Sequence, residues 1–112
     1  MKIYHNPRCR KSREGVQYLT DKKINFEIFD YLKEGVSEDD IKSILKKLNM
    51  SAIELVRKNE KIWKDNFKGK ELKEEQIISI LCEEPKLIER PIIVHKNKAV
   101  IGRPKENIDN LI

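Results

Sequence analysis

The chain has 112 residues, of which 38% are apolar and 38% are charged. This length suits a single domain with a hydrophobic core, residues 1–112, and the composition excludes a disordered chain. The net charge of +5 favours anionic partners, but no basic stripe with interleaved aromatics indicates a nucleic-acid surface. Because there is no apolar run of about 18–20 residues and no signal peptide, we expect a cytoplasmic protein that does not enter a membrane.

The first part of the sequence predicts a strand–helix–strand unit. Residues 2–4 form a short strand, Asn6-Pro7 breaks it, and a helix begins around Cys9 and runs to about Thr20. The next apolar residues alternate with polar ones, as in a half-buried strand: Ile24, Phe26 and Ile28. Units of this kind normally have parallel strands with a right-handed connection.

A helical middle section follows. Ser37 is a suitable N-cap for a helix, and Ser51 with Glu54 forms a capping-box pattern that opens a shorter helix through Val56. Apolar residues recur at i, i+3, i+4 and i+7 after the first cap: Ile41, Ile44, Leu45 and Leu48. An apolar cluster in the middle of the chain belongs to the predicted core: Ile62, Trp63 and Phe67. Residues 74–83 are predicted to be helical, with Pro85 ending the run.

The C-terminal part predicts an antiparallel hairpin, with strands at residues 91–95 and 99–101 around a short turn at 96–98. Pro104 suits the first turn of a closing helix. Together these elements predict an α/β protein with a four-stranded mixed sheet, helices packed on it, and the inserted helices gathered at about residues 34–84.

The two cysteines, Cys9 and Cys82, are too few and too far apart for a disulfide scaffold. With only two histidines they form no zinc pattern, so no metal is expected. In a reducing compartment a lone cysteine is either a packing residue or a reactive thiol. Cys82 lies on the apolar-patterned helix before Pro85, and we interpret it as a core residue.

Cys9 stands directly after a strand and a breaker, at the start of a helix, where free N–H groups and the helix dipole favour a thiolate. Cations crowd the same turn and lower a cysteine's pKa: Arg8, Arg10, Lys11 and Arg13. His5 and the Ser12 hydroxyl are close enough in sequence to donate hydrogen bonds to the sulfur. Since a cationic helix N-terminus also binds oxyanions, the pattern predicts a nucleophile beside an anion site. The alternative is a packing cysteine flanked by solvated charges.

The segment Ile3-Tyr4-His5-Asn6-Pro7-Arg8-Cys9-Arg10-Lys11-Ser12-Arg13 resembles the active-site segment of the glutaredoxin-coupled arsenate reductase family. Members of that family are thioredoxin-like proteins with a helical insertion. Three further segments resemble those that carry the family's substrate-binding arginines: Glu54–Asn59 with Arg57, Ile88–Val94 with Arg90, and Ile101–Pro104 with Arg103. Three arginines offer forked, permanently charged donors to a tetrahedral oxyanion. The resemblance also implies a cis peptide bond before Pro91 that faces Cys9.

By this resemblance the protein is a thiol-dependent oxidoreductase that reduces arsenate to arsenite. The Cys9 thiolate attacks the bound arsenate, glutathione attacks the resulting adduct, and glutaredoxin restores the enzyme. Glutathione is then a co-substrate, glutaredoxin or thioredoxin a partner, and no bound cofactor is expected. Ser12, in place of a second cysteine, fits an external resolving thiol, and nothing in the sequence demands more than a monomer.

Two alternatives stay open at this point. One keeps the thiol chemistry and changes the substrate to a disulfide or another oxyanion. The other is an Spx-like regulator, which shares the fold and binds RNA polymerase. Those regulators usually carry Cys-x-x-Cys, whereas Ser12 occupies the second position in this chain.

Overall fold

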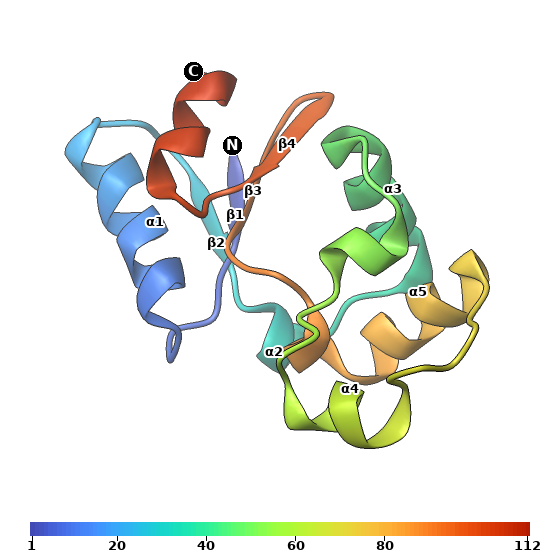
Figure 1. The fold of residues 1–112 in the computed structure, drawn as a ribbon. Coiled ribbons are helices and arrows are strands. Elements are labelled where there is room, and N and C mark those ends of the chain that lie inside the picture. The colour runs from blue at the N-terminus through green and yellow to red at the C-terminus, as the bar shows by residue number, and fades with distance from the viewer.

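A computed structural model describes all of residues 1–112 as an α/β fold (Figure 1). The strands are β1 (Lys2–Tyr4), β2 (Glu27–Phe29), β3 (Ile92–His95) and β4 (Lys98–Ile101). The α-helices are α1 (Arg10–Asp21), α2 (Tyr31–Glu34), α3 (Glu38–Leu48), α4 (Lys61–Asn66) and α5 (Glu74–Glu83). Three 3₁₀ helices complete the chain: η1 (Ala52–Leu55), η2 (Pro85–Leu87) and η3 (Lys105–Leu111). No helix is both long enough and apolar enough to cross a membrane.

The four strands form one mixed sheet in the order β2-β1-β3-β4. β1 pairs in parallel with β2, as the strand–helix–strand prediction requires, and antiparallel with β3. β3 and β4 form the predicted hairpin. The register places Ile3 of the central strand opposite Ile28 on one side and Ile93 on the other. The predicted four-stranded mixed sheet is therefore confirmed.

The sheet separates two hydrophobic cores, because successive side chains of a strand point to opposite faces. Ile3 and Ile93 belong to a small cluster of five buried residues beneath α1 and η3. Their chain neighbours Tyr4 and Ile92 belong to a cluster of 18 buried residues on the other face. Figure 1 shows α1 and the C-terminal helix on one side of the sheet and α2 to α5 on the other. The inserted helices thus build most of the core.

Local capping fixes the inserted helices as the sequence predicts. The Ser37 side chain accepts from the Asp40 N–H over 3.1 Å, and the Asp40 carboxylate accepts from the Ser37 N–H over 3.1 Å. At η1 the Ser51 N–H donates to Glu54 over 2.8 Å. This second helix is a single 3₁₀ turn that ends at Leu55, and the next residue already pairs with the segment before β3.

Two expectations about the edges of the fold are wrong. Ile28 was expected to face inward, but it lies on the edge strand β2 and is 52% exposed. β2 has only three residues, too few to show a dependable alternation. Pro104 precedes the closing helix instead of lying in its first turn, because its backbone is extended and η3 begins at Lys105. The inserted helices also begin earlier, at Tyr31, than the predicted residue 34.

Candidate active site

Cys9 lies where β1 leads into α1, at the N-cap position of the helix. Its N–H donates to the Asn6 carbonyl oxygen over 3.0 Å, and its own carbonyl oxygen accepts the first helical hydrogen bond, from Arg13, over 3.0 Å. The N–H groups of Lys11 and Ser12, in the first turn, have no partner within the helix and lie near the sulfur. The turn therefore holds the thiol where the helix dipole stabilises negative charge.

The pKa of Cys9 is lower than that of an ordinary thiol, although burial acts in the opposite direction. Burial is the largest single influence and raises the pKa, whereas the Arg90 guanidinium lowers it, together with the backbone N–H groups of Ser12 and Lys11. The side chain is also half-buried, not enclosed. Because the thiolate is the nucleophilic form of cysteine, this thiol is both activated and accessible.

His5 and Ser12 stabilise the turn around Cys9. The buried Ser12 hydroxyl lies 2.7 Å from His5 Nδ1 and accepts the Asn6 N–H over 2.9 Å. Burial lowers the pKa of His5, Asp30 raises it and Arg13 lowers it, with a net decrease that favours the neutral imidazole at pH 7. The hydrogen bonds of these two side chains run within the turn and do not reach the sulfur. The nearest Ser12 group that stabilises the thiolate is its backbone N–H.

Two of the three predicted arginines come together through an antiparallel pairing of residues 55–57 with residues 87–89. Two backbone hydrogen bonds, of 2.7 and 2.9 Å, join these segments. Arg57 ends the first segment, and Arg90 directly follows the second, at the start of β3. Because β3 pairs with β1, the strand that leads to Cys9, the same pairing brings both arginines to the thiol side of the sheet.

The segment of Arg90 packs tightly against α1. The Arg90–Pro91 peptide bond is cis, the configuration that the resemblance implied. A Cβ atom added to Gly15 of α1 would stand 2.9 Å from Pro91 Cγ, and one added to Gly102 would stand 3.1 Å from the same atom. Neither glycine has room for a side chain. This close approach holds the start of β3 against the helix that follows Cys9.

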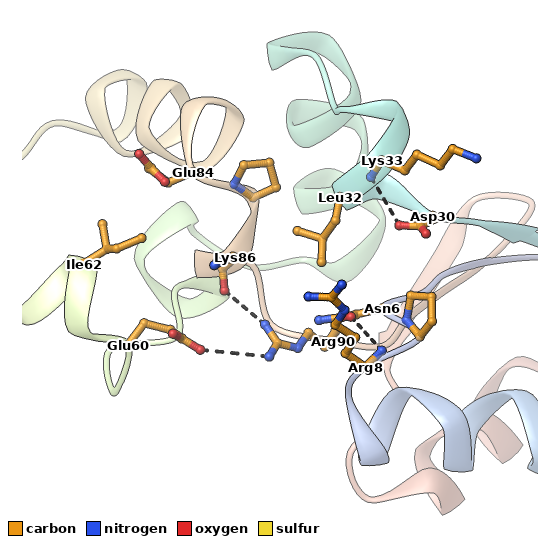
Figure 2. Close-up of a pocket in the computed structure, with 12 residues that line it drawn as sticks. Asn6, Arg8, Asp30, Leu32, Lys33, Glu60, Ile62, Glu84, Lys86 and Arg90 are labelled. Carbon is orange, nitrogen blue, oxygen red and sulfur yellow. Dashed lines mark hydrogen bonds and ion pairs between the residues drawn. The ribbon is translucent and has the colours of Figure 1, made fainter.

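The guanidinium groups of Arg57 and Arg90 are largely buried, with 19% and 11% of their side chains exposed. Arg90 Nη1 donates to the Lys86 carbonyl oxygen over 3.0 Å, and its Nη2 lies 3.9 Å from Glu60 Oε1 (Figure 2). The same carboxylate oxygen lies 3.4 Å from Arg57 Nε. Two buried nitrogens have neither a hydrogen bond nor an ion-pair contact, Arg57 Nη1 and Arg90 Nε, and the ion pair of Arg57 Nε with Glu60 lacks hydrogen-bond geometry. Buried donors without an acceptor are costly and rare, so this pair is suited to receive an anion.

The contacts of Arg103 are with residues other than Arg57 and Arg90. Its Nη1 is 3.8 Å from Glu89 Oε2, and its carbonyl oxygen accepts from Asn107 over 3.3 Å. It lines a separate depression between β4 and η3, and its ion pair does not reach Cys9. Since Glu89 is the neighbour of Arg90 in the chain, Arg103 is tied to the same segment from its other side. Its part in substrate binding stays a prediction.

An open pocket of about 660 Å³ adjoins Arg90 (Figure 2). It lies among the turn before Cys9, α2, the start of α4 and η2. Cations outnumber carboxylates in its lining: Arg8, Lys33, Lys86 and Arg90 against Asp30, Glu60 and Glu84. Its size and its charged lining fit a small polar molecule with negative charges.

The sequence prediction missed two residues of this site. Glu60 contacts both arginines, and its spacing of three residues after Arg57 is a signal that could have indicated the ion pair. Tyr31, the first residue of α2, is 1% exposed, and its hydroxyl makes no hydrogen bond. Tertiary packing brings Tyr31 to this part of the fold, and no local sequence pattern predicts its position.

The comparisons with known proteins agree with this geometry. The model of the ArsC family matches residues 4–111. An arsenate reductase of Haemophilus influenzae is 37% identical to this chain, covering 95% of this chain and 93% of its own length. The uncharacterized protein YfgD of Escherichia coli is 41% identical, covering 100% of this chain and 96% of its own length. The solved arsenate reductase of Vibrio cholerae superposes on this chain with a TM-score of 0.94 at 33% identity, covering 100% of this chain and 98% of its own. This likeness confirms the predicted thioredoxin-like fold with its helical insertion. This chain therefore belongs to the ArsC family, whose model matches it from the strand before the thiol turn to the last helix.

Proposed function

We propose that this protein is a thiol-dependent arsenate reductase in which Cys9 is the nucleophile. The observation that carries the proposal is the pairing of an activated thiol with donors that lack an acceptor. The Arg90 guanidinium lowers the pKa of Cys9, while Arg57 and Arg90 retain buried nitrogens without hydrogen bonds. A tetrahedral oxyanion at this point would satisfy those nitrogens and lie beside the sulfur.

The chemistry follows from the charges. Two guanidinium groups neutralise arsenate enough for a thiolate to approach, and they stabilise the charge that develops as it attacks. A sulfur–arsenic bond forms at Cys9 while one arsenate oxygen leaves as water after protonation. A glutathione thiolate then attacks the Cys9 sulfur, so that a disulfide forms and the electron pair of the sulfur–arsenic bond reduces arsenic. Arsenite leaves, and glutaredoxin with a second glutathione returns Cys9 to the thiol.

An external thiol is favoured by what surrounds Cys9. Ser12 stands where a second cysteine of the turn would be, and its hydroxyl is buried in hydrogen bonds to His5 and Asn6. The pocket of about 660 Å³ beside Arg90 has room for a tripeptide thiol. Its excess of cations suits the carboxylates of glutathione.

The test is arsenate-dependent NADPH oxidation with glutathione, glutaredoxin and glutathione reductase supplied. We expect turnover by the wild type, a fall to background in Cys9→Ser, and retained turnover in Cys82→Ser. Replacing glutaredoxin with thioredoxin and its reductase identifies the preferred reductant. Turnover that survives in Cys9→Ser, or a wild type that consumes no NADPH in response to arsenate with either reductant, would contradict the proposal.

A further inference from the structure

Tyr31 carries a buried polar group that the proposed reaction has not used. It begins α2, its side chain packs in the larger core, and only 1% of the residue is exposed. Its hydroxyl is buried and makes no hydrogen bond. A phenylalanine would fill the same space without the cost of burying an unpaired hydroxyl. The hydroxyl therefore calls for a partner that is absent from the folded chain.

The charged groups around the phenol oxygen restrict what that partner is. Burial is the main influence on Tyr31 and raises its pKa to about 12. Arg90 lowers the pKa by its charge and as a donor close to the phenol oxygen, the Cys9 thiolate raises it, and the charge of Arg57 lowers it. The phenol is thus protonated at neutral pH. The chain neighbours of Tyr31, Asp30 and Leu32, line the same pocket as Arg90, so the charges that act on the phenol come from the side of the molecule that carries the proposed anion site. Guanidinium groups have no lone pair to accept its hydrogen.

The sulfur is not the partner in the free protein. The Tyr31 hydroxyl makes no hydrogen bond to the Cys9 sulfur or to any other atom of the chain. The phenol therefore has no acceptor in the free protein, although two cations and a thiolate are its charged neighbours. An oxygen atom of an anion bound by the two arginines would supply one.

We propose that Tyr31 is a substrate-binding residue, whose neutral phenol donates a hydrogen bond to one oxygen of the oxyanion held by Arg57 and Arg90. This inference rests on the proposed function, because it assigns a further donor to the same anion site. The arginines supply charge, while the phenol adds a directional donor. Such a donor requires a lone pair at one position of the tetrahedron and so contributes to the choice of anion.

The test is Tyr31→Phe in a Cys82→Ser background, where Cys9 is the single thiol. The measurement is the rate of Cys9 alkylation by iodoacetamide at increasing arsenate concentration, because a bound anion shields the sulfur. We expect the arsenate concentration for half-protection to rise about tenfold, the loss typical of a hydrogen bond to a charged group. The alkylation midpoint without arsenate should stay unchanged, and the Tm should stay unchanged or rise.

Tyr18→Phe in the same background is the matched control. It removes a phenol whose hydroxyl binds Asp109 over 2.6 Å on the exposed side of α1, so arsenate protection should equal that of the parent. Equal arsenate protection in Tyr31→Phe and the parent would overturn the inference and leave the proposed function standing. A lower Tm or a shifted midpoint of Cys9 would also overturn it, because the phenol would then serve the protein itself.

Repeating the alkylation measurement with phosphate and with sulfate distinguishes failure of the proposed function from failure of the role of Tyr31. If they protect Cys9 in the parent and arsenate does not, the proposed function fails, and the Tyr31→Phe comparison is made with the protecting anion. An increase of about tenfold in its half-protection concentration then supports the role of Tyr31, and an unchanged value overturns it. If none of the three anions protects the parent, no oxyanion site exists beside Cys9 and both proposals are overturned.

Discussion

The two cysteines of this chain lie in opposite electrostatic surroundings. Both are free and half-buried, yet the pKa of Cys9 is lowered and that of Cys82 is raised. Burial raises the pKa in both places. At Cys82 the carboxylates Glu38, Asp40 and Glu83 raise it further. At Cys9 the Arg90 guanidinium and backbone N–H groups outweigh burial. The charge of the neighbours, not the degree of exposure, distinguishes the thiol with the lowered pKa from the thiol with the raised pKa.

The position of each cysteine on its helix explains part of this difference. Cys9 is the N-cap of α1, at the positive end of the helix dipole. Cys82 is the penultimate residue of α5, near its negative end, with Glu83 beside it. The acidic first turn of α3, which includes Glu38 and Asp40, also faces Cys82. Helix direction and local charge act together at both sites, with opposite signs.

The largest effect is expected from removing Arg90, the cation that lowers the pKa of Cys9. Arg90→Ala should lower kcat/KM for arsenate by about a hundredfold or more, because it removes an oxyanion donor. It should also move the alkylation midpoint of Cys9 to higher pH. Arg10→Ala is the matched control, since that arginine is largely exposed and paired with Glu14 at 3.5 Å. Equal losses in the two variants would show that overall positive charge, and not the position of Arg90, activates the thiol.

A smaller effect is expected in the relative reactivity of the two thiols. At pH 7, Cys9 should be alkylated faster than Cys82, because at a pH below both pKa values the thiol with the lower pKa has the larger fraction of thiolate. Peptide mass spectrometry after limited iodoacetamide treatment measures both rates in one sample. Equal rates at pH 7 that diverge only in denaturant would contradict the comparison.

The same pKa shifts predict opposite pH dependences of stability. A lowered pKa means that the unfolded state holds the Cys9 proton to higher pH, so this thiol adds stability as the pH rises from its folded pKa toward its unfolded one. A raised pKa at Cys82 removes stability as the pH rises from its unfolded pKa toward its folded one. Urea unfolding of Cys9→Ser and Cys82→Ser between pH 6 and pH 10 should show these opposite slopes relative to the wild type.

The smallest effect is expected at Cys82. Glu38→Gln combined with Glu83→Gln should lower its pKa and raise its alkylation rate at pH 8 a few-fold, the size typical of partly exposed charges. Raising the salt concentration should produce a similar acceleration in the wild type and little further change in the double variant. If the double variant matches the wild type, then the charges of Glu38 and Glu83 do not slow the reaction of Cys82, and burial and Asp40 remain as its causes.

Most of the fold could be predicted because its signals are local. Patterns of neighbouring residues predict three of its elements: the helix capped by Ser37 and Asp40, the helix at residues 74–83 and the hairpin. The helices α2 and α4 were not predicted, since four and six residues are too few to show a helical period. The predicted burial of Ile28 was wrong because the alternation of apolar and polar residues does not indicate whether a strand lies at a sheet edge.

The site divides in the same way. Cys9 could be predicted from its turn and the helix that follows, whereas Arg57 and Arg90 needed the resemblance, because their meeting depends on residues far apart in the chain. The role of Arg103 also came from the resemblance and stays a prediction, since the structure shows its guanidinium in an ion pair with Glu89. Tyr31 could not be predicted, because burial and missing partners are properties of the folded molecule.

The two cores on opposite faces of the sheet have a consequence for protein engineering. The thiol is fixed by α1, which packs on the smaller core. Tyr31, Arg57 and Glu60, in contrast, come from the insertion that builds the larger one. The turn that holds the thiol and most of the proposed anion-binding residues thus belong to different parts of the fold, which meet along β1 and β3 with Arg90 at their junction. A designer could graft a different insertion between β2 and Arg90 to change the anion that is held, provided that Arg90, which lowers the pKa of Cys9, is retained.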